Sequence, residues 1–161
     1  MAPISLVVDK IRAIRETAAG AQIPLLINAR TDVYLTGVAD TQPLLAETVA
    51  RATAYREAGA DCVFAPDAGG ALDAEVIRTL VREIPAPLNI LAGEATPSIP
   101  ELEALGVARV SFGPRAMRAA LALLRRIARE WREAGTYSTM FSEALSFAEV
   151  KQMLDRSECS A

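Results

Sequence analysis

Four short apolar segments recur along the chain, and each is bounded by residues that favour turns. Apolar residues make up most of their length, and three of the four lack a polar residue at every second position. Strands that are covered on both faces have this near-continuous apolar character. The pattern therefore predicts four buried β-strands, over Ile23–Ala29, Cys62–Ala65, Leu88–Leu91 and Arg109–Phe112.

Apolar residues with a helical repeat lie before, between and after these segments. Five stripes have this spacing: Val7, Ile11, Ile14 and Ala18; Leu45, Val49 and Ala52; Leu72, Val76 and Leu80; Ile99, Leu102 and Leu105; and Met117, Leu121, Leu124, Ala128 and Trp131. A last helix is predicted over Phe147–Leu154. Gly59 and Gly106 each stand between a helix and a strand, where a left-handed glycine would end the helix.

Strands that alternate with helices predict right-handed crossovers and a parallel sheet, so the fold class is α/β. A whole (β/α)8 barrel, or TIM barrel, takes about 250 residues. This chain has 161 residues and four of the strand–helix units. We therefore expect a partial (β/α)8 barrel with about four parallel strands, flanking helices and an extra C-terminal helix. Residues 1–161 would form a single partial domain.

Composition narrows the classes of function. The formal net charge is −3 and basic residues are spread among acidic ones, which argues against nucleic-acid binding. No apolar run could span a bilayer, and the first residues lack the pattern of a signal peptide. We therefore expect a cytoplasmic protein with no membrane partner.

Histidine is missing from the chain, which excludes Ser-His-Asp and Cys-His catalysis and imidazole zinc sites within it. Its chemistry must use carboxylates, arginine, amides, hydroxyls or a metal held by oxygen. Of the two cysteines, Cys62 lies in an apolar strand and is predicted to be a core residue. Cys159 lies in a polar tail and has no predicted role.

The segment Asn28–Asp32 ends the first predicted strand and contains the clearest candidate for chemistry, Arg30. Ligands of parallel α/β folds bind at the carboxyl ends of the strands. A guanidinium offers a planar fork of donors that fits a carboxylate or a phosphonate, and it stays charged at any working pH. The alternative is a structural ion pair with Asp32 or another loop acid.

Several motifs together resemble the isocitrate lyase and phosphoenolpyruvate mutase superfamily, particularly its small single-barrel members. They are Asn28–Asp32, Ala50–Ala52 with Ala54 and Tyr55, Glu57–Asp61 with Val63–Pro66, Pro87–Leu91, and Leu105–Gly113. The resemblance covers nearly the whole chain. It corresponds only to the C-terminal half of the family barrel, from about the helix before the fifth strand onward.

This resemblance implies an enzyme that cleaves a carbon–carbon bond of a 2-oxo or 2-hydroxy carboxylic acid through an enolate. It also implies Mg²⁺ or Mn²⁺, held largely by aspartates and water in the earlier half of the barrel, so the ligating aspartates are absent from this chain. The gating loop also belongs to that half. We therefore expect a fragment that is inactive alone, with a small carboxylic acid as substrate.

Two other interpretations stay open. One is the chemistry of phosphoenolpyruvate mutase or phosphonopyruvate hydrolase in the same pocket. The other is a non-catalytic half-barrel that assembles, because open sheet edges favour association. The expected protein partner is a second copy, giving a homo-oligomer, or a complementing N-terminal half. Family members associate through C-terminal helices, so a helix within 142–154 would pack on or exchange with a neighbour.

The resemblance assigns substrate contact to Arg30, with Asp32 orienting it. Asn89 lies near the family's substrate-binding asparagine, although an amide satisfied by adjacent backbone is the alternative. Ser111 stands at a strand–turn–helix junction that could bind an anion, but a purely structural turn is favoured there. Gly93 lies in a rim loop after Asn89 and is a further substrate-binding candidate.

Two acidic residues near this rim are weaker candidates. Glu94 could face a substrate, but a solvated loop acid is the commoner case. Asp67 follows the second strand, where lyases of the superfamily often have a glutamate. That difference leaves the identity of the substrate open.

Overall fold

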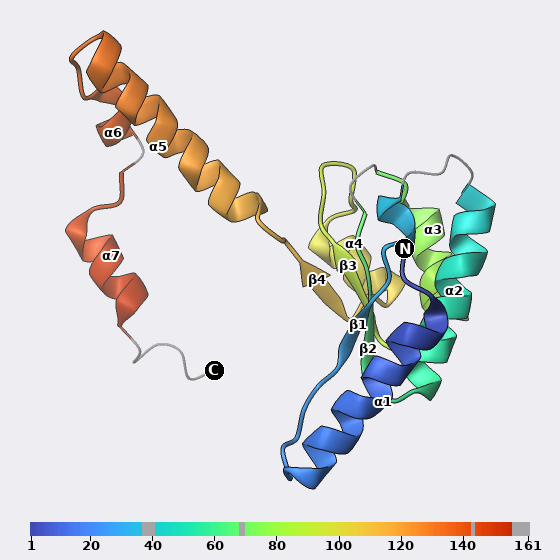
Figure 1. Ribbon diagram of the computed structural model, residues 1–161. Helices are drawn as coiled ribbons and strands as arrows, with labels where there is room; N and C mark the ends of the chain where they lie inside the picture. The colour runs from blue at the N-terminus through green and yellow to red at the C-terminus, as the bar shows by residue number, and fades with distance from the viewer. Residues whose placement is uncertain (37–40, 68–69, 143, 156–161) are drawn as a thin grey trace. The chain divides into compact units, whose positions relative to one another are not determined.

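The computed structural model describes residues 1–36, 41–67, 70–142 and 144–155 (Figure 1). The chain divides into two compact units, Met1–Gly113 and Pro114–Ala161.

The first unit is a parallel sheet whose strands alternate with helices (Figure 1). In chain order its elements are α1 (Ile4–Gly20), β1 (Asn28–Arg30), a 3-10 turn η1 (Val33–Leu35), α2 (Thr41–Glu57), β2 (Cys62–Ala65), α3 (Ala74–Glu83), β3 (Leu88–Leu91), α4 (Ile99–Leu105) and β4 (Arg109–Ser111). Each strand pairs in parallel with the next, in the order β1-β2-β3-β4. The α/β class and the partial (β/α)8 barrel are therefore confirmed.

The two faces of the sheet differ in chemistry because successive side chains of a strand point to opposite sides. The outer face packs against the helices and includes Val63, Leu88 and Ile90, which are at most 1 % exposed. On the opposite, inner face, the strand register aligns Arg30, Phe64, Asn89 and Arg109 in one row across the four strands. The core thus lies under the helices, and the polar row lies on the inner face.

The first strand is shorter than predicted. The prediction was Ile23–Ala29, whereas β1 contains only Asn28, Ala29 and the following residue, Arg30, which pair with β2. The ladder begins where the Asp61 and Cys62 N–H groups both donate to the carbonyl of Ile27. Residues before Ile27 have no strand beside them in the described sheet. Leu26 is 69 % exposed, so the prediction of a strand buried on both faces is wrong for this segment.

The helix predictions are confirmed for α1 to α5 and for α7, with small shifts at the ends. Gly59 and Gly106 have φ values of 109° and 90°, which are the left-handed conformations expected after α2 and α4. Leu72 belongs to the core but precedes α3, because Asp73 caps that helix by accepting from two backbone N–H groups. Two short elements, η1 and α6, were not predicted.

The second unit contains α5 (Arg115–Glu133), α6 (Ser138–Ser142) and α7 (Phe147–Leu154). The Glu130 carboxylate accepts hydrogen bonds from the Thr136 hydroxyl and the Ser138 and Thr139 N–H groups, which ties α6 to the end of α5. These bonds, led by that from Thr136, lower the pKa of Glu130 to about 2. The single partial domain and the exchange of a helix within 142–154 stay predictions.

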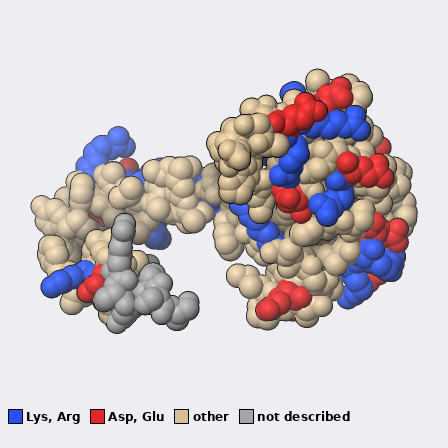
Figure 2. Space-filling view, turned by 90° about the horizontal axis from the view of Figure 1, so that it is seen from below, with Lys and Arg blue, Asp and Glu red and all other residues tan. Residues whose placement is uncertain are grey.

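Charged side chains of both signs lie on the face drawn in Figure 2. Figure 2 shows lysine and arginine next to aspartate and glutamate over the face that it presents. None of the helices within the described ranges has both the length and the apolarity that a membrane span requires.

Candidate functional site

Arg30 ends β1 with its side chain on the inner face, about half exposed. Its Nε donates to Asp32 Oδ1 at 2.5 Å, so the ion pair considered as the alternative is present. The same contact fixes the plane of the guanidinium. Its carbon lies 5.9 Å from the centroid of the Phe64 ring, a cation–π distance. Neither Nη group of Arg30 has a hydrogen-bond partner among the described residues, so both are available to an anion.

Asn89 is 0 % exposed in the middle of β3, two strands from Arg30 in the same row. Its Oδ1 accepts a hydrogen bond from Ser111 Oγ at 3.1 Å. Its Nδ2 lacks any partner within the part of the chain that the structure describes. An unpaired buried donor costs about 1–3 kcal/mol. This amide is therefore not satisfied by adjacent backbone as the alternative required, and its free N–H groups are suited to a ligand oxygen.

Ser111, on β4, holds the amide of Asn89 in place through that hydrogen bond. The Ser111 carbonyl accepts from the N–H of Ala92, which fixes the start of the following loop. In this loop the N–H of Gly93 donates to Thr96 Oγ1 at 2.8 Å. A substrate contact by the Gly93 N–H would require that bond to break, whereas Glu94 is exposed at the loop surface, as expected for a solvated acid.

Phe64 lies between Arg30 and Asn89 in the row, and sequence reasoning did not identify it. The sequence pattern placed Phe64 in a predicted strand. The face of the sheet on which it lies follows only from the register of β2 with the neighbouring strands. Its ring gives the inner face an apolar floor under the Arg30 guanidinium. Asn28 was also missed as a separate candidate. Its Oδ1 is buried and has no partner among the described residues.

Carboxylates near the carboxyl edge are engaged in local contacts. Asp32 is paired with Arg30, and Asp67 is 7 % exposed and accepts from the N–H of Leu72. In the described ranges, no three histidine, cysteine, aspartate or glutamate side chains gather as a metal site would require. These described residues therefore do not fit a divalent ion by themselves.

Cys62 is 7 % exposed, and burial raises the pKa of its thiol. This agrees with the prediction of a core residue. Cys159 lies outside the described residues.

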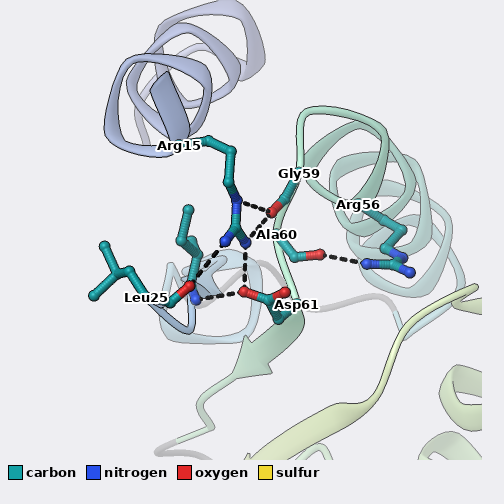
Figure 3. A network of polar contacts seen from close by, with 7 residues as sticks. Arg15, Leu25, Arg56, Gly59, Ala60 and Asp61 are labelled. Carbon is teal, nitrogen blue, oxygen red and sulfur yellow. Dashed lines mark hydrogen bonds and ion pairs between the residues drawn. The ribbon is translucent and has the colours of Figure 1, made fainter. Parts of the chain in front are cut away.

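A second polar cluster, around Arg15, lies where the strands begin rather than at their carboxyl ends (Figure 3). Each guanidinium nitrogen of Arg15 donates a hydrogen bond within the cluster. Arg15 donates to the carbonyls of Gly59 and Leu25 and to Asp61 Oδ2 at 2.5 Å. The carboxylate of Asp61 also accepts from the Ile27 N–H, and this bond followed by Arg15 lowers the pKa of Asp61. Since the donors are used, and since this edge of such folds serves stability, the cluster is a structural clamp that joins α1 to the strand starts.

The model of the family described as phosphoenolpyruvate phosphomutase matches residues 1–132. An uncharacterised protein of Mycobacterium tuberculosis is 43 % identical over 90 residues, which are 55 % of this chain and 32 % of that protein. The solved structure of a protein from Burkholderia cenocepacia J2315, described as a lyase or mutase, has a TM-score of 0.80 at 35 % identity. The match covers 94 % of this chain and 53 % of that one.

The solved structure of 2,3-dimethylmalate lyase, a member of the phosphoenolpyruvate mutase and isocitrate lyase superfamily, has a TM-score of 0.70 at 27 % identity. It covers 97 % of this chain, which spans 51 % of that protein. The chain thus spans about a third of the curated relative and about half of each solved chain.

Proposed function

We propose that this chain, which belongs to the phosphoenolpyruvate phosphomutase family, supplies the acid-binding half of a lyase. The reaction is cleavage of a carbon–carbon bond in a 2-oxo or 2-hydroxy carboxylic acid. One observation carries the proposal: the unpaired, fully buried Nδ2 of Asn89 lies in the same row of the inner face as Arg30. Two side chains that can donate hydrogen bonds to an acid thus lie in the part of the sheet where such folds bind ligands.

The spacing of the row favours a small acid. Neighbouring strands lie about 4.8 Å apart, so the Cα atoms of Arg30 and Asn89 are about 10 Å apart. The guanidinium reaches inward over Phe64 and shortens the gap between the donors. The carboxylate accepts from the Nη groups of Arg30, while the 2-oxo or 2-hydroxy oxygen accepts from Asn89 Nδ2. Phe64 supports the carbon chain between them and excludes water from it.

In the cleavage of a 2-hydroxy acid, the hydroxyl gives its proton to a base and becomes the carbonyl of one fragment as the neighbouring carbon–carbon bond breaks. The electron pair of that bond stays with the other fragment as an enolate. Donors fixed before the reaction stabilise such developing charge without reorganisation. Asn89 is fixed by Ser111 and Arg30 by Asp32. This half therefore binds and orients the acid, and the remaining catalytic groups are assigned to the part of the family barrel that this chain does not span. The cytoplasmic location of the protein and the inactivity of the isolated chain stay predictions.

Phosphonate chemistry is the second candidate, supported by the description of the matching family as a phosphomutase. The guanidinium fork of Arg30 suits three phosphonate oxygens as well as two carboxylate oxygens. The two candidates separate on the preferred ligand. Tighter binding of phosphonopyruvate than of oxalate or pyruvate would favour phosphorus–carbon chemistry.

The test is calorimetric titration of the full chain with oxalate and pyruvate. Because a hydrogen bond to a charged group is worth about 1.5–3 kcal/mol, Arg30→Gln should weaken binding by about 10- to 100-fold. The matched control is Arg12→Gln, since Arg12 is an exposed arginine on α1. Equal affinities of the wild-type, Arg30→Gln and Arg12→Gln chains would overturn the proposal.

A further inference from the structure

Two apolar side chains adjoin the donors of the proposed acid site, and we call them the apolar pair. Phe64 on β2 lies beside Asn89 in the register, and Leu91 follows Asn89 by two residues on β3, so all three share the inner face. Leu91 is paired with Ser111, and its Cδ1 lies 3.3 Å from the point that a Cβ at Gly113 would occupy. The side chain of Leu91 therefore lies on the carboxyl side of Asn89, in the direction in which such folds bind ligands.

The four bonds of carbon 2 of a 2-hydroxy acid have different surroundings in this site. With the carboxylate on Arg30 and the hydroxyl oxygen on Asn89, two of them lie along the row of the inner face. The bond that breaks points away from the sheet, toward the part of the barrel to which the remaining catalytic groups are assigned. The fourth substituent then faces Phe64 and Leu91. On the basis of the function proposed above, we infer that this substituent is an alkyl chain longer than methyl, so that the released 2-oxo acid is longer than pyruvate.

The spacing of the apolar pair favours a chain longer than methyl. The Cα atoms of Asn89 and Leu91 are about 6.6 Å apart along the strand, and those of Phe64 and Leu91 are roughly 8 Å apart on the diagonal. A methyl group above Asn89 leaves part of this span empty, whereas a longer chain fills it. Both members of the pair are already partly buried, so the chain covers the apolar surface that remains. Each methylene group removed from water in this way raises the affinity about fourfold.

The charges around the apolar pair disfavour a carboxylate at the end of this substituent. Asp32 stands at the same carboxyl edge, paired with Arg30, and its negative charge repels a second anion. Arg109, the other arginine of the row, begins β4 two residues before Ser111, and so lies toward the amino ends of the strands. A carboxylate against Leu91 would lose its hydration without gaining a cationic partner among the described residues. An alkyl chain carries no such cost.

The test compares two acids of equal length with pyruvate, in calorimetric titrations of the full chain. 2-Oxopentanoate ends in a methyl group where 2-oxoglutarate ends in a carboxylate. We expect 2-oxopentanoate to bind about 15-fold more tightly than pyruvate, because it has two additional methylene groups. It should also bind at least about 10-fold more tightly than 2-oxoglutarate, because the second carboxylate is desolvated beside Leu91.

A single substitution should reverse this preference. Leu91→Lys removes apolar surface and supplies a cation for the terminal carboxylate, so 2-oxoglutarate should then bind more tightly than 2-oxopentanoate. The matched control is Leu6→Lys, at a leucine of α1 that is 47 % exposed, and it should keep the wild-type order. In the wild-type chain, the terminal methyl protons of 2-oxopentanoate should show nuclear Overhauser effects to the methyl groups of Leu91, a result that does not depend on whether a variant folds.

The outcomes separate the alkyl substituent from the acid site itself. Suppose that pyruvate binds and that Arg30→Gln weakens its binding. Equal affinities for 2-oxopentanoate and 2-oxoglutarate, a folded Leu91→Lys chain with the wild-type order, or saturation without an effect at Leu91 would then overturn the alkyl substituent and leave the acid site intact. If none of the three acids binds, the proposed acid site is wrong, and the alkyl substituent that rests on it is wrong as well.

Discussion

Replacement of Asn89 by leucine distinguishes a functional role of this buried amide from a structural one. The two side chains have similar size and shape, so the change mainly removes polar atoms. If Asn89 is kept for ligand binding, the ligand-free chain should gain stability when the amide is lost. If Asn89 is kept for the fold, stability should fall.

The expected size follows from the contacts of the amide. The unpaired Nδ2 costs about 1–3 kcal/mol, whereas the hydrogen bond from Ser111 to Oδ1 contributes about 0.5–1.5 kcal/mol. Loss of both should raise the free energy of unfolding by about 1 kcal/mol. The matched control is Thr48→Val: Thr48 is equally buried, but its hydroxyl donates to the Leu44 carbonyl at 2.8 Å, so its loss should cost about 1 kcal/mol.

Urea unfolding followed by the amide NMR signals of residues 1–113 is the suitable assay. Tryptophan fluorescence would report on the other unit, where the only tryptophan, Trp131, lies. A decrease of more than about 1 kcal/mol for Asn89→Leu would refute the reasoning, because the amide would then stabilise the fold more than its described contacts allow.

Four further predictions concern the clamp around Arg15 and Asp61, the glycine that ends α4, and the catalytic activity of the chain alone. Arg15→Met should lower stability by about 2 kcal/mol, because it removes several partly exposed hydrogen bonds. The pKa of Asp61 is lowered by a backbone N–H and then by Arg15, so its contribution is present above its ordinary pKa and is lost as the pH falls through the lowered value; Asp61→Asn should flatten the acid limb of a stability–pH curve. Gly106→Ala should cost about 1–2 kcal/mol in thermal or urea unfolding, since φ is 90° and a Cβ would lie 3.0 Å from Val81 Cγ1, whereas Gly20→Ala should cost nothing; equal effects would contradict this. The purified chain with Mg²⁺ and a panel of small 2-hydroxy acids should release no pyruvate or glyoxylate in a coupled assay, and release above the blank would contradict the assignment of catalytic groups to another part of the barrel.

The four strands could be predicted from the sequence because a short apolar run bounded by turn residues indicates a buried strand by itself. It failed at Ile23–Leu26, because an apolar segment becomes a strand only when another strand pairs with it. That partner is not part of the described sheet. The same physical cause makes these residues exposed.

For the site, Arg30 and Asn89 were predictable from strand ends and from resemblance, whereas Phe64 was not. The position of Phe64 between them depends on the register of three strands, which no local pattern encodes. The α6 helix was not predicted because it also depends on a contact outside its own segment. Its first N–H groups are capped by Glu130, a residue eight positions earlier on another helix.

The most direct test of the proposed acid site is the side-chain amide signal of Asn89 in a ¹H–¹⁵N NMR titration with oxalate. One carboxylate of oxalate should accept from Arg30, and the other, in the place of the 2-oxo group, should accept from Asn89 Nδ2. The Asn89 signal should then shift with saturation. Arg30→Gln should move the midpoint to an oxalate concentration about 10- to 100-fold higher, and Arg12→Gln should leave it unchanged. An unmoved Asn89 signal at ligand concentrations that shift other residues would contradict the account.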